Sequence, residues 1–242
     1  MPFATHRGQR IHYTIEGSGP LVILQHGVLL SAESWKQSGI VDALTDDYRV
    51  ACIDSLGHGL SDKPSDPALY GQAQRSGDIV AVLDAIGDER AHLIGHSMGG
   101  WTAVGVAKYY PERLASLVVG GWHPVSGLPP GPRGPVSYDA FMIFAKRTAP
   151  GLVEWITADT EPGVRACFEA LGELQGGREA VLNRNFPVMI WDGRDDPYHA
   201  PKQSFAVDNR LPFLSTAGDH LGMLFSHGIE GAAGIRGFLN AV

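Results

Sequence analysis

Apolar residues occur along this chain in two kinds of pattern that alternate with each other. Continuous apolar runs, such as Leu21–Leu24 and Leu114–Gly120, are typical of strands buried on both faces of a sheet. Between such runs, apolar residues recur every three or four positions, as over Tyr70–Ile86, and this spacing is typical of a helix that buries one face. The alternation predicts an α/β fold, in which right-handed crossovers place helices on both faces of a parallel sheet.

The N-terminal pattern is different, because residues 3–16 alternate between apolar and polar around a turn at Arg7-Gly8-Gln9. This alternation predicts an antiparallel hairpin at a sheet edge. The other expected strands are 21–24, 48–54, 91–96, 114–120, 186–191 and 212–216. The expected helices of the sheet region are 31–45, 70–86, 98–110, 201–209 and a terminal helix from Leu221, inside which His227 would lie.

The regular alternation stops between Trp122 and Asn185. This region opens with a Gly/Pro-rich stretch, 128–135, and continues with short helical patterns at 138–147, 152–158, 163–174 and 178–182. We interpret 122–185 as a helical lid inserted after the sixth strand, and residues 1–121 together with 186–242 as the core domain.

Composition narrows the class of protein. With 44% hydrophobic and 19% charged residues, the chain can bury a core as a folded globule. The net charge is −7 and Lys and Arg do not cluster, so we expect no nucleic-acid partner. The N-terminal residues lack the apolar segment of a signal peptide, and no run reaches the roughly 18 apolar residues of a spanning helix, which predicts a cytoplasmic protein with no membrane partner. Cys52 and Cys167 lack metal-binding or redox spacing.

The sequence Gly95-His96-Ser97-Met98-Gly99 lies where one buried strand meets the following helix. A G-x-S-x-G sequence in this context is typical of a nucleophile elbow, a sharp turn that lifts a serine clear of the sheet. Side chains at the two glycine positions would collide with neighbouring backbone, and the serine itself takes strained dihedral angles. We therefore predict that Ser97 is a catalytic nucleophile.

A serine hydroxyl is a weak nucleophile at neutral pH, so Ser97 needs a histidine that accepts its proton and an acid that orients the histidine. In open α/β sheets, functional loops gather beyond the carboxyl ends of the strands. Asp195, Asp196 and His220 follow the last two expected strands, in the chain order serine, acid, histidine. On position alone, either aspartate could be the acid.

With these residues the chain resembles the α/β-hydrolase superfamily, and within it the lid-bearing esterase and lactonase-like branch. The similarity extends from His26-Gly27 through the loop 54–61 and the elbow to 193–197 and 218–220. The resemblance implies a mostly parallel, eight-stranded sheet. It also implies that Asp196, which stands three residues after Gly193 and directly before Pro197, is the catalytic acid.

The same resemblance implies that His220 is the catalytic histidine. It places the oxyanion hole on the backbone N–H groups of Val28 and Met98, and such donors leave little trace in side chains. It implies no metal and no cofactor.

Five residues are our candidates for contact with the substrate. Trp122 and His123 follow the expected strand 114–120, and His123 would lie at the mouth of the site. Leu29 follows His26-Gly27-Val28. The insertion carries more apolar residues than its short helices can bury among themselves, so we expect Phe141 and Phe144 to belong to an apolar roof over the pocket.

Most of the ten histidines have ordinary roles in this interpretation. We expect His26 and His58 to make structural hydrogen bonds, and His96 to pack beneath the serine.

These residues predict a serine hydrolase that cleaves a small to medium, largely apolar carboxylic ester or lactone through an acyl-enzyme. A C–C bond hydrolase of diketone-type substrates stays open, because such enzymes use similar triads and lids. A perhydrolase-like enzyme also stays open, because the run 26–35 resembles the corresponding run of those enzymes. A hormone-receptor-type, ligand-binding hydrolase fold is the alternative that is not an enzyme. The expected partner is the small-molecule ester or lactone, and the oligomeric state stays open.

Overall fold

The computed structural model describes residues 2–131, 134–172 and 175–242. Within them, eight strands form one sheet in the order β1-β2-β4-β3-β5-β6-β7-β8. The strands are β1 (Phe3–His6), β2 (Gln9–Glu16), β3 (Leu21–Gln25), β4 (Arg49–Ile53), β5 (Ala91–His96), β6 (Leu114–Gly120), β7 (Val188–Gly193) and β8 (Phe213–Thr216). The pairs β1–β2 and β2–β4 are antiparallel and the other neighbours are parallel, which confirms the predicted fold class.

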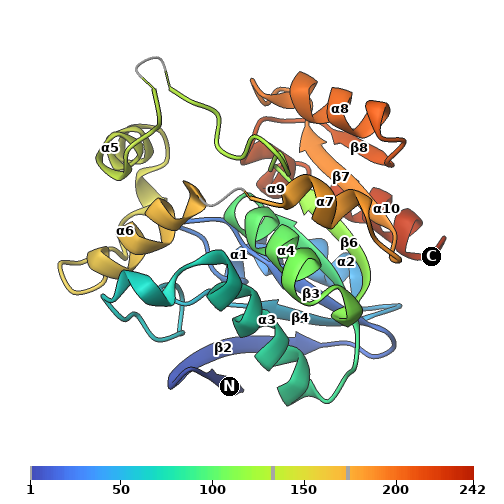
Figure 1. Cartoon of the computed structure of the whole chain (residues 1–242), viewed down its shortest axis with the longest axis horizontal. Coiled ribbons are helices and arrows are strands. Elements are labelled where there is room, and N and C mark those ends of the chain that lie inside the picture. Colours follow the sequence, from blue (N-terminus) through green and yellow to red (C-terminus); the bar gives the residue numbers. More distant parts are fainter. Residues whose placement is uncertain (1, 132–133, 173–174) are drawn as a thin grey trace.

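The two faces of the sheet carry different sets of helices (Figure 1). One layer contains α3 (Gln72–Ile86), α4 (Met98–Tyr109) and α8 (His199–Asp208). The opposite layer contains α1 (Ala32–Gln37), α2 (Ile40–Leu44), α9 (Gly222–Phe225) and α10 (Gly228–Leu239). Successive strand residues alternate between the layers: Ile23 packs in the first and Leu24 in the second. Both faces are therefore covered, as the continuous apolar runs predict.

Two expected helices are each divided in the structure, and both predictions were wrong in this respect. The helix expected over 31–45 breaks at Gly39, whose φ of 75° is left-handed, and continues as α2. The terminal helix is divided into α9 and α10, so His227 precedes α10 instead of lying inside a helix. At this break a Cβ on Gly228 would lie 2.3 Å from the Ser38 carbonyl oxygen, so close packing against the end of α1 fixes the path of the chain.

The segment between β6 and β7 contains α5 (Tyr138–Thr148), α6 (Glu161–Glu169) and α7 (Gly177–Leu182). Figure 1 shows α5 and α6 to one side of the sheet, whereas α7 packs against α4. The helix expected at 152–158 is wrong: a short 3-10 turn, Pro150–Leu152, gives way to irregular backbone. The pattern expected over 163–174 begins in α6 and continues as a 3-10 turn, Ala170–Gly172, and its end at Leu174 lies outside the described residues.

Candidate active site

Ser97 occupies the turn between β5 and α4, near the middle of the sheet. Its φ of 58° is left-handed, a conformation that costs energy for any residue with a side chain. A Cβ on Gly95 would lie 2.1 Å from the Gly99 carbonyl oxygen, and a Cβ on Gly99 would lie 1.9 Å from the Gln25 carbonyl oxygen. Both positions therefore require glycine, which is the steric basis of the G-x-S-x-G pattern.

Asp196 and His220 meet at the carboxyl edge of the sheet. Asp196 follows β7 and His220 follows β8, and His220 Nδ1 lies 3.2 Å from Asp196 Oδ2. The Asp196 side chain is buried, whereas 39% of the His220 side chain is exposed. The second oxygen of Asp196 accepts a hydrogen bond of 2.7 Å from the backbone N–H of Tyr198, so both oxygens of this carboxylate are held.

The neighbouring acid, Asp195, has a different hydrogen-bond partner. It is exposed, and its Oδ2 accepts a hydrogen bond of 3.2 Å from the Gly218 backbone N–H. This contact joins the loops after β7 and β8. Of the two adjacent acids, the one that the structure brings to His220 is Asp196.

His96, directly before Ser97, connects His220 to the elbow. Its Nε2 donates a hydrogen bond of 2.9 Å to the His220 carbonyl oxygen, and the two imidazole centroids are 4.9 Å apart. Burial lowers the pKa of His96 to about 3, so this ring is neutral at physiological pH. His96 thus packs beneath the site as predicted.

Asp196 also lies near a positive charge that was not predicted from the sequence. The ammonium of Lys202, a buried residue of α8, lies 3.3 Å from Asp196 Oδ2 and 2.6 Å from Asp192 Oδ1. Burial raises the pKa of Asp196, but the hydrogen bond from His220 and the ammonium of Lys202 outweigh burial and hold this pKa well below its usual range. Asp196 is therefore a carboxylate at neutral pH.

The loop after β3 lies against the serine turn. A Cβ on Gly27 would lie 3.0 Å from Ser97 Cβ, so this loop passes directly beside Ser97. Leu29 has a left-handed φ of 68°, and its backbone N–H donates to His58 Nε2 over 3.2 Å. Met98 opens α4, where the first backbone N–H groups have no acceptor within the helix. The predicted oxyanion donors, Val28 and Met98, therefore belong to two neighbouring segments.

A profile of the alpha/beta hydrolase fold matches residues 20–130. The 2-hydroxy-6-oxo-6-phenylhexa-2,4-dienoate hydrolase of Comamonas testosteroni is 31% identical over 206 residues, which are 83% of this chain and 69% of that protein. The chain belongs to the α/β-hydrolase family.

Other members of the α/β-hydrolase family match in part. The cis-3-alkyl-4-alkyloxetan-2-one decarboxylase of Shewanella oneidensis is 36% identical over 127 residues, 49% of this chain and 39% of that protein. The enol-lactonase of Burkholderia xenovorans LB400 superposes with a TM-score of 0.78 at 22% identity, over 99% of this chain and 100% of that chain, which shows the shared fold. The chain spans 34% of the length of a Mycobacterium tuberculosis relative that it matches over 120 residues.

Two further histidines of this hydrolase fold support the loops around the site. His26 Nδ1 donates to the Gly27 carbonyl oxygen over 2.7 Å, and its Nε2 accepts from the Ser55 backbone N–H over 3.0 Å. Burial lowers the pKa of His26 to about 4 and places that of His58 well below its usual value. Both rings are neutral hydrogen-bonding groups, which confirms their predicted structural role.

The predicted substrate contacts have different surroundings. Trp122 is buried, and its Cβ lies 2.8 Å from the point where a Cβ on Gly100 would stand. His123 is half-buried; its Nδ1 accepts hydrogen bonds of 3.2 and 3.0 Å from the backbone N–H groups of Val125 and Ser126. These contacts assign neither residue a role toward substrate, so that role stays a prediction.

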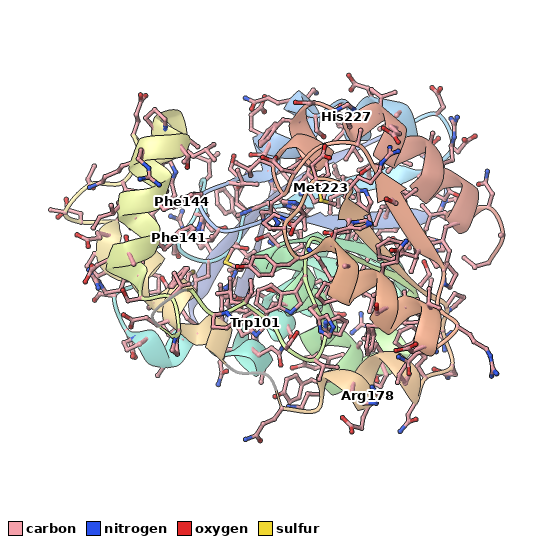
Figure 2. The ribbon with its side chains drawn as sticks, turned by 90° about the horizontal axis from the view of Figure 1, so that it is seen from above. Trp101, Phe141, Phe144, Arg178, Met223 and His227 are labelled. Carbon is pink, nitrogen blue, oxygen red and sulfur yellow. The ribbon has the colours of Figure 1, made fainter. Side chains whose placement is uncertain are left out.

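Phe141 and Phe144 both lie on α5, as Figure 2 shows. Phe141 stacks on Phe168 with ring centroids 4.6 Å apart, whereas 55% of Phe144 is exposed. A hollow in the same insertion is lined by Tyr138, Asp139, Met142, Ile143, Lys146, Val153, Ile156, Thr157, Ala158 and Glu161. The insertion therefore has an internal aromatic contact at Phe141 and an unpacked aromatic side chain at Phe144.

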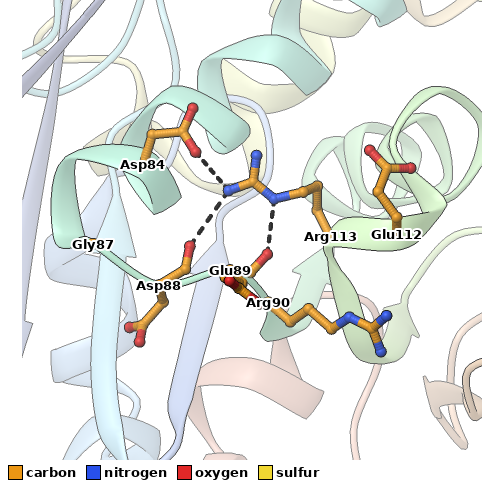
Figure 3. A pocket seen from close by; sticks show the side chains of 7 residues that line it. All are labelled: Asp84, Gly87, Asp88, Glu89, Arg90, Glu112 and Arg113. Atoms are coloured by element: carbon orange, nitrogen blue, oxygen red, sulfur yellow. Dashed lines mark hydrogen bonds and ion pairs between the residues drawn. The ribbon is translucent and has the colours of Figure 1, made fainter.

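A second hollow, shown in Figure 3, lies near the amino-terminal ends of β5 and β6. Arg113 crosses it and donates to the Asp84 carboxylate over 2.5 Å and to the Glu89 carbonyl oxygen over 2.8 Å. The lining residues flank the starts of β5 and β6, whereas Ser97 follows the end of β5. This hollow is therefore remote from the elbow.

The described part of the chain contains no group of three or more His, Cys, Asp or Glu residues placed to hold a metal ion. Across residues 2–131, 134–172 and 175–242, no helix is both long enough and apolar enough to cross a membrane.

Proposed function

We propose that this chain is a serine hydrolase that cleaves a small to medium, largely apolar carboxylic ester or lactone through an acyl-enzyme. The observation that carries the proposal is the contact between Asp196 and His220, which the His96 hydrogen bond joins to the strained turn at Ser97. A nucleophile, a base within its reach and an acid that orients the base are the parts that acyl transfer requires.

In the first half of the proposed reaction, Ser97 Oγ attacks the carbonyl carbon of the substrate and its proton passes to His220 Nε2. The backbone N–H groups of Val28 and Met98 stabilise the resulting oxyanion. When the intermediate collapses, the imidazolium returns the proton to the leaving alkoxide, and an acyl-Ser97 ester remains.

In the second half, water attacks the acyl ester and gives its proton to His220. Collapse of this second intermediate frees Ser97, which recovers its proton, and releases the carboxylic acid. With a lactone, the alcohol stays attached to the acyl group and a hydroxy acid leaves. Throughout, Asp196 keeps the Nδ1–H tautomer of His220 and stabilises the imidazolium.

We further propose that 122–185 acts as a lid and that the protein works in the cytoplasm. Support for the lid comes from Trp155, whose indole N–H donates to the Leu29 carbonyl oxygen and so joins the insertion to the loop beside Ser97. The helix α7 packs on α4 and would stay with the core.

The decisive experiment treats the purified chain and a Ser97→Ala variant with a fluorophosphonate and weighs the intact proteins. The wild type should gain one phosphonyl group with loss of fluoride, and the variant should gain none. Ester turnover by Ser97→Ala should fall by about 10⁶ in kcat. Labelling of the variant would refute Ser97 as the nucleophile.

The relative from Comamonas testosteroni favours a second candidate, a C–C bond hydrolase of diketone-type substrates, because its name specifies a 2-hydroxy-6-oxo-dienoate. A panel of aryl esters, lactones and such dienoates separates the two activities by kcat/KM. Our proposal expects the esters or lactones to have the highest values. A preference for the dienoates would establish the second candidate, and ligand binding without turnover would indicate a receptor-type protein.

A further inference from the structure

Lys202 is a charged residue in the protein interior, where an unpaired charge is energetically unfavourable. It is 3% exposed on α8, and its ammonium contacts two carboxylates, Asp192 at 2.6 Å and Asp196 at 3.3 Å. Asp192 is fully buried at the end of β7, and its other oxygen lies 3.1 Å from His199 Nδ1. Because well-packed apolar residues often stabilise a protein as much as a buried ion network does, stability alone is a weak reason for this arrangement.

The geometry relates Lys202 to the candidate base through one atom. Asp196 Oδ2 lies 3.2 Å from His220 Nδ1 and 3.3 Å from Lys202 Nζ. The imidazole and the ammonium therefore share one carboxylate oxygen. A fixed positive charge bound to the same carboxylate oxygen opposes the formation of a second positive charge on the imidazole.

We infer that Lys202 is a positioning residue that sets the basicity of His220 by sharing Asp196 Oδ2 with it. The inference rests on the proposed function, in which His220 is the base. Lys202 fixes the carboxylate oxygen and reduces the negative charge that His220 experiences. More of His220 is then neutral, and able to accept the Ser97 proton, at slightly acidic pH.

The other titratable groups around His220 and Lys202 do not supply the positive charge that acts on Asp196. His220 faces Asp196 from the loop after β7 and His96 from the end of β5, and Asp219 precedes it in the chain. Burial keeps His96 neutral. Lys202 in turn is close to Asp192, Asp196 and His199, and its charge also contributes to the lowered pKa of His96 and of His123.

The test compares Lys202→Met with Lys202→Arg in the full chain. The ring-proton signals of His220 are assigned by their loss in His220→Asn and followed by NMR against pH. Removing the ammonium in Lys202→Met should raise the pKa of His220 by about one unit, and Lys202→Arg, which keeps the charge, should stay close to wild type. An unchanged His220 pKa in folded Lys202→Met would overturn the inference.

A second variant covers the possibility that Lys202→Met fails to fold around the unpaired Asp192. Asp192→Asn combined with Lys202→Met leaves no uncompensated carboxylate at that pair, and it should still show an upward shift, because the ammonium is the member that contacts Asp196. No shift in this folded double variant would equally overturn the inference.

Kinetics supply an independent readout where the wild type turns over an ester. The acid limb of kcat/KM in Lys202→Met should move to higher pH by the same amount, so that activity falls up to about tenfold on the acid side and little on the alkaline plateau. A protein that turns over neither esters nor lactones would refute the proposed function, while the NMR titration would still decide whether Lys202 controls His220.

Discussion

The indole N–H of Trp155 donates a hydrogen bond of 3.3 Å to the main-chain oxygen of Leu29. The same indole lies 5.5 Å from the His58 ring, and His58 in turn accepts from the Leu29 N–H. The insertion is thus bonded to the loop that passes beside Ser97, although 126 residues separate the two partners in sequence. We expect this contact to hold the loop after β3 in its left-handed turn at Leu29.

Trp155→Phe keeps an aromatic ring beside His58 but removes the donor. A single neutral hydrogen bond contributes about 0.5–1.5 kcal/mol, so we expect kcat to fall by a factor of roughly 2 to 13. Ester kinetics and thermal unfolding measure the two effects. Ile143→Ala, at an exposed position of the same insertion, is the control and should leave both unchanged. A kcat equal to wild type in Trp155→Phe would show that the loop does not depend on this bond.

The adjacent acids provide a matched pair. Asp196→Asn replaces the oxygen that meets His220 and favours the wrong imidazole tautomer, so we expect kcat to fall by about 10⁴. Asp195→Asn alters an exposed loop contact and should stay within about tenfold of wild type. Steady-state ester kinetics of both purified variants give the ranking, and the opposite ranking would transfer the role to Asp195.

Most of the sheet could be predicted from the sequence because its signals are local. Apolar runs mark strands buried on both faces, and the crowded elbow needs glycine at positions 95 and 99 whatever surrounds it. The order of Ser97, Asp196 and His220 along the chain follows from the topology of the sheet. Asp196 was separated from Asp195 by resemblance alone, and the contact with His220 now favours the same residue.

The sequence does not show which residues contact each other in the folded protein. Lys202 looks like an ordinary surface lysine until α8 packs on β7 and buries it against Asp192. The one available signal is that Lys202 stands six residues after Asp196, on the helix that directly follows the acid loop. Trp155 and Leu29 meet only through tertiary packing, and the breaks at Gly39 and His227 likewise depend on neighbouring chain segments.

Two glycines test the steric argument for the elbow. In Gly99→Ala the new Cβ would lie 1.9 Å from a backbone oxygen of β3, so α4 must shift, and we expect a loss of about 3 kcal/mol or more of stability. Gly237→Ala, inside α10 with open space around the new Cβ, should stabilise the protein by about 0.5–1 kcal/mol. Urea unfolding of both variants checks the contrast, and a Gly99→Ala protein as stable as wild type would contradict the crowding.

Stability should fall with acid because three histidines are buried in the neutral form. Burial lowers the pKa of His26 to about 4 and of His96 to about 3, and that of His58 is also well below 6.5. Below about pH 6.5 the unfolded chain binds protons that the folded chain does not, so each histidine costs up to about 1.4 kcal/mol per pH unit. Urea unfolding between about pH 7 and pH 5 measures the slope. A wild-type stability that is constant over the same range would mean that the buried rings titrate as they do in the unfolded chain.

The last prediction concerns the proposed roof, because Phe141 and Phe144 differ in packing. Phe141→Ala removes the stack on Phe168 and should cost roughly 1–3 kcal/mol, less than for a fully buried phenylalanine. Phe144 is 55% exposed, so Phe144→Ala should change stability by less than about 0.5 kcal/mol. If α5 roofs the pocket, Phe144→Ala must nevertheless change the relative kcat/KM across a series of esters with lengthening acyl chains, since an apolar wall favours longer chains.

Unfolding curves and the acyl series, measured on the same preparations, separate the two roles. A Phe144→Ala variant with wild-type stability and wild-type acyl preference would remove Phe144 from the roof, and a Phe141→Ala variant that is destabilised without a change in preference would make Phe141 a packing residue of the insertion.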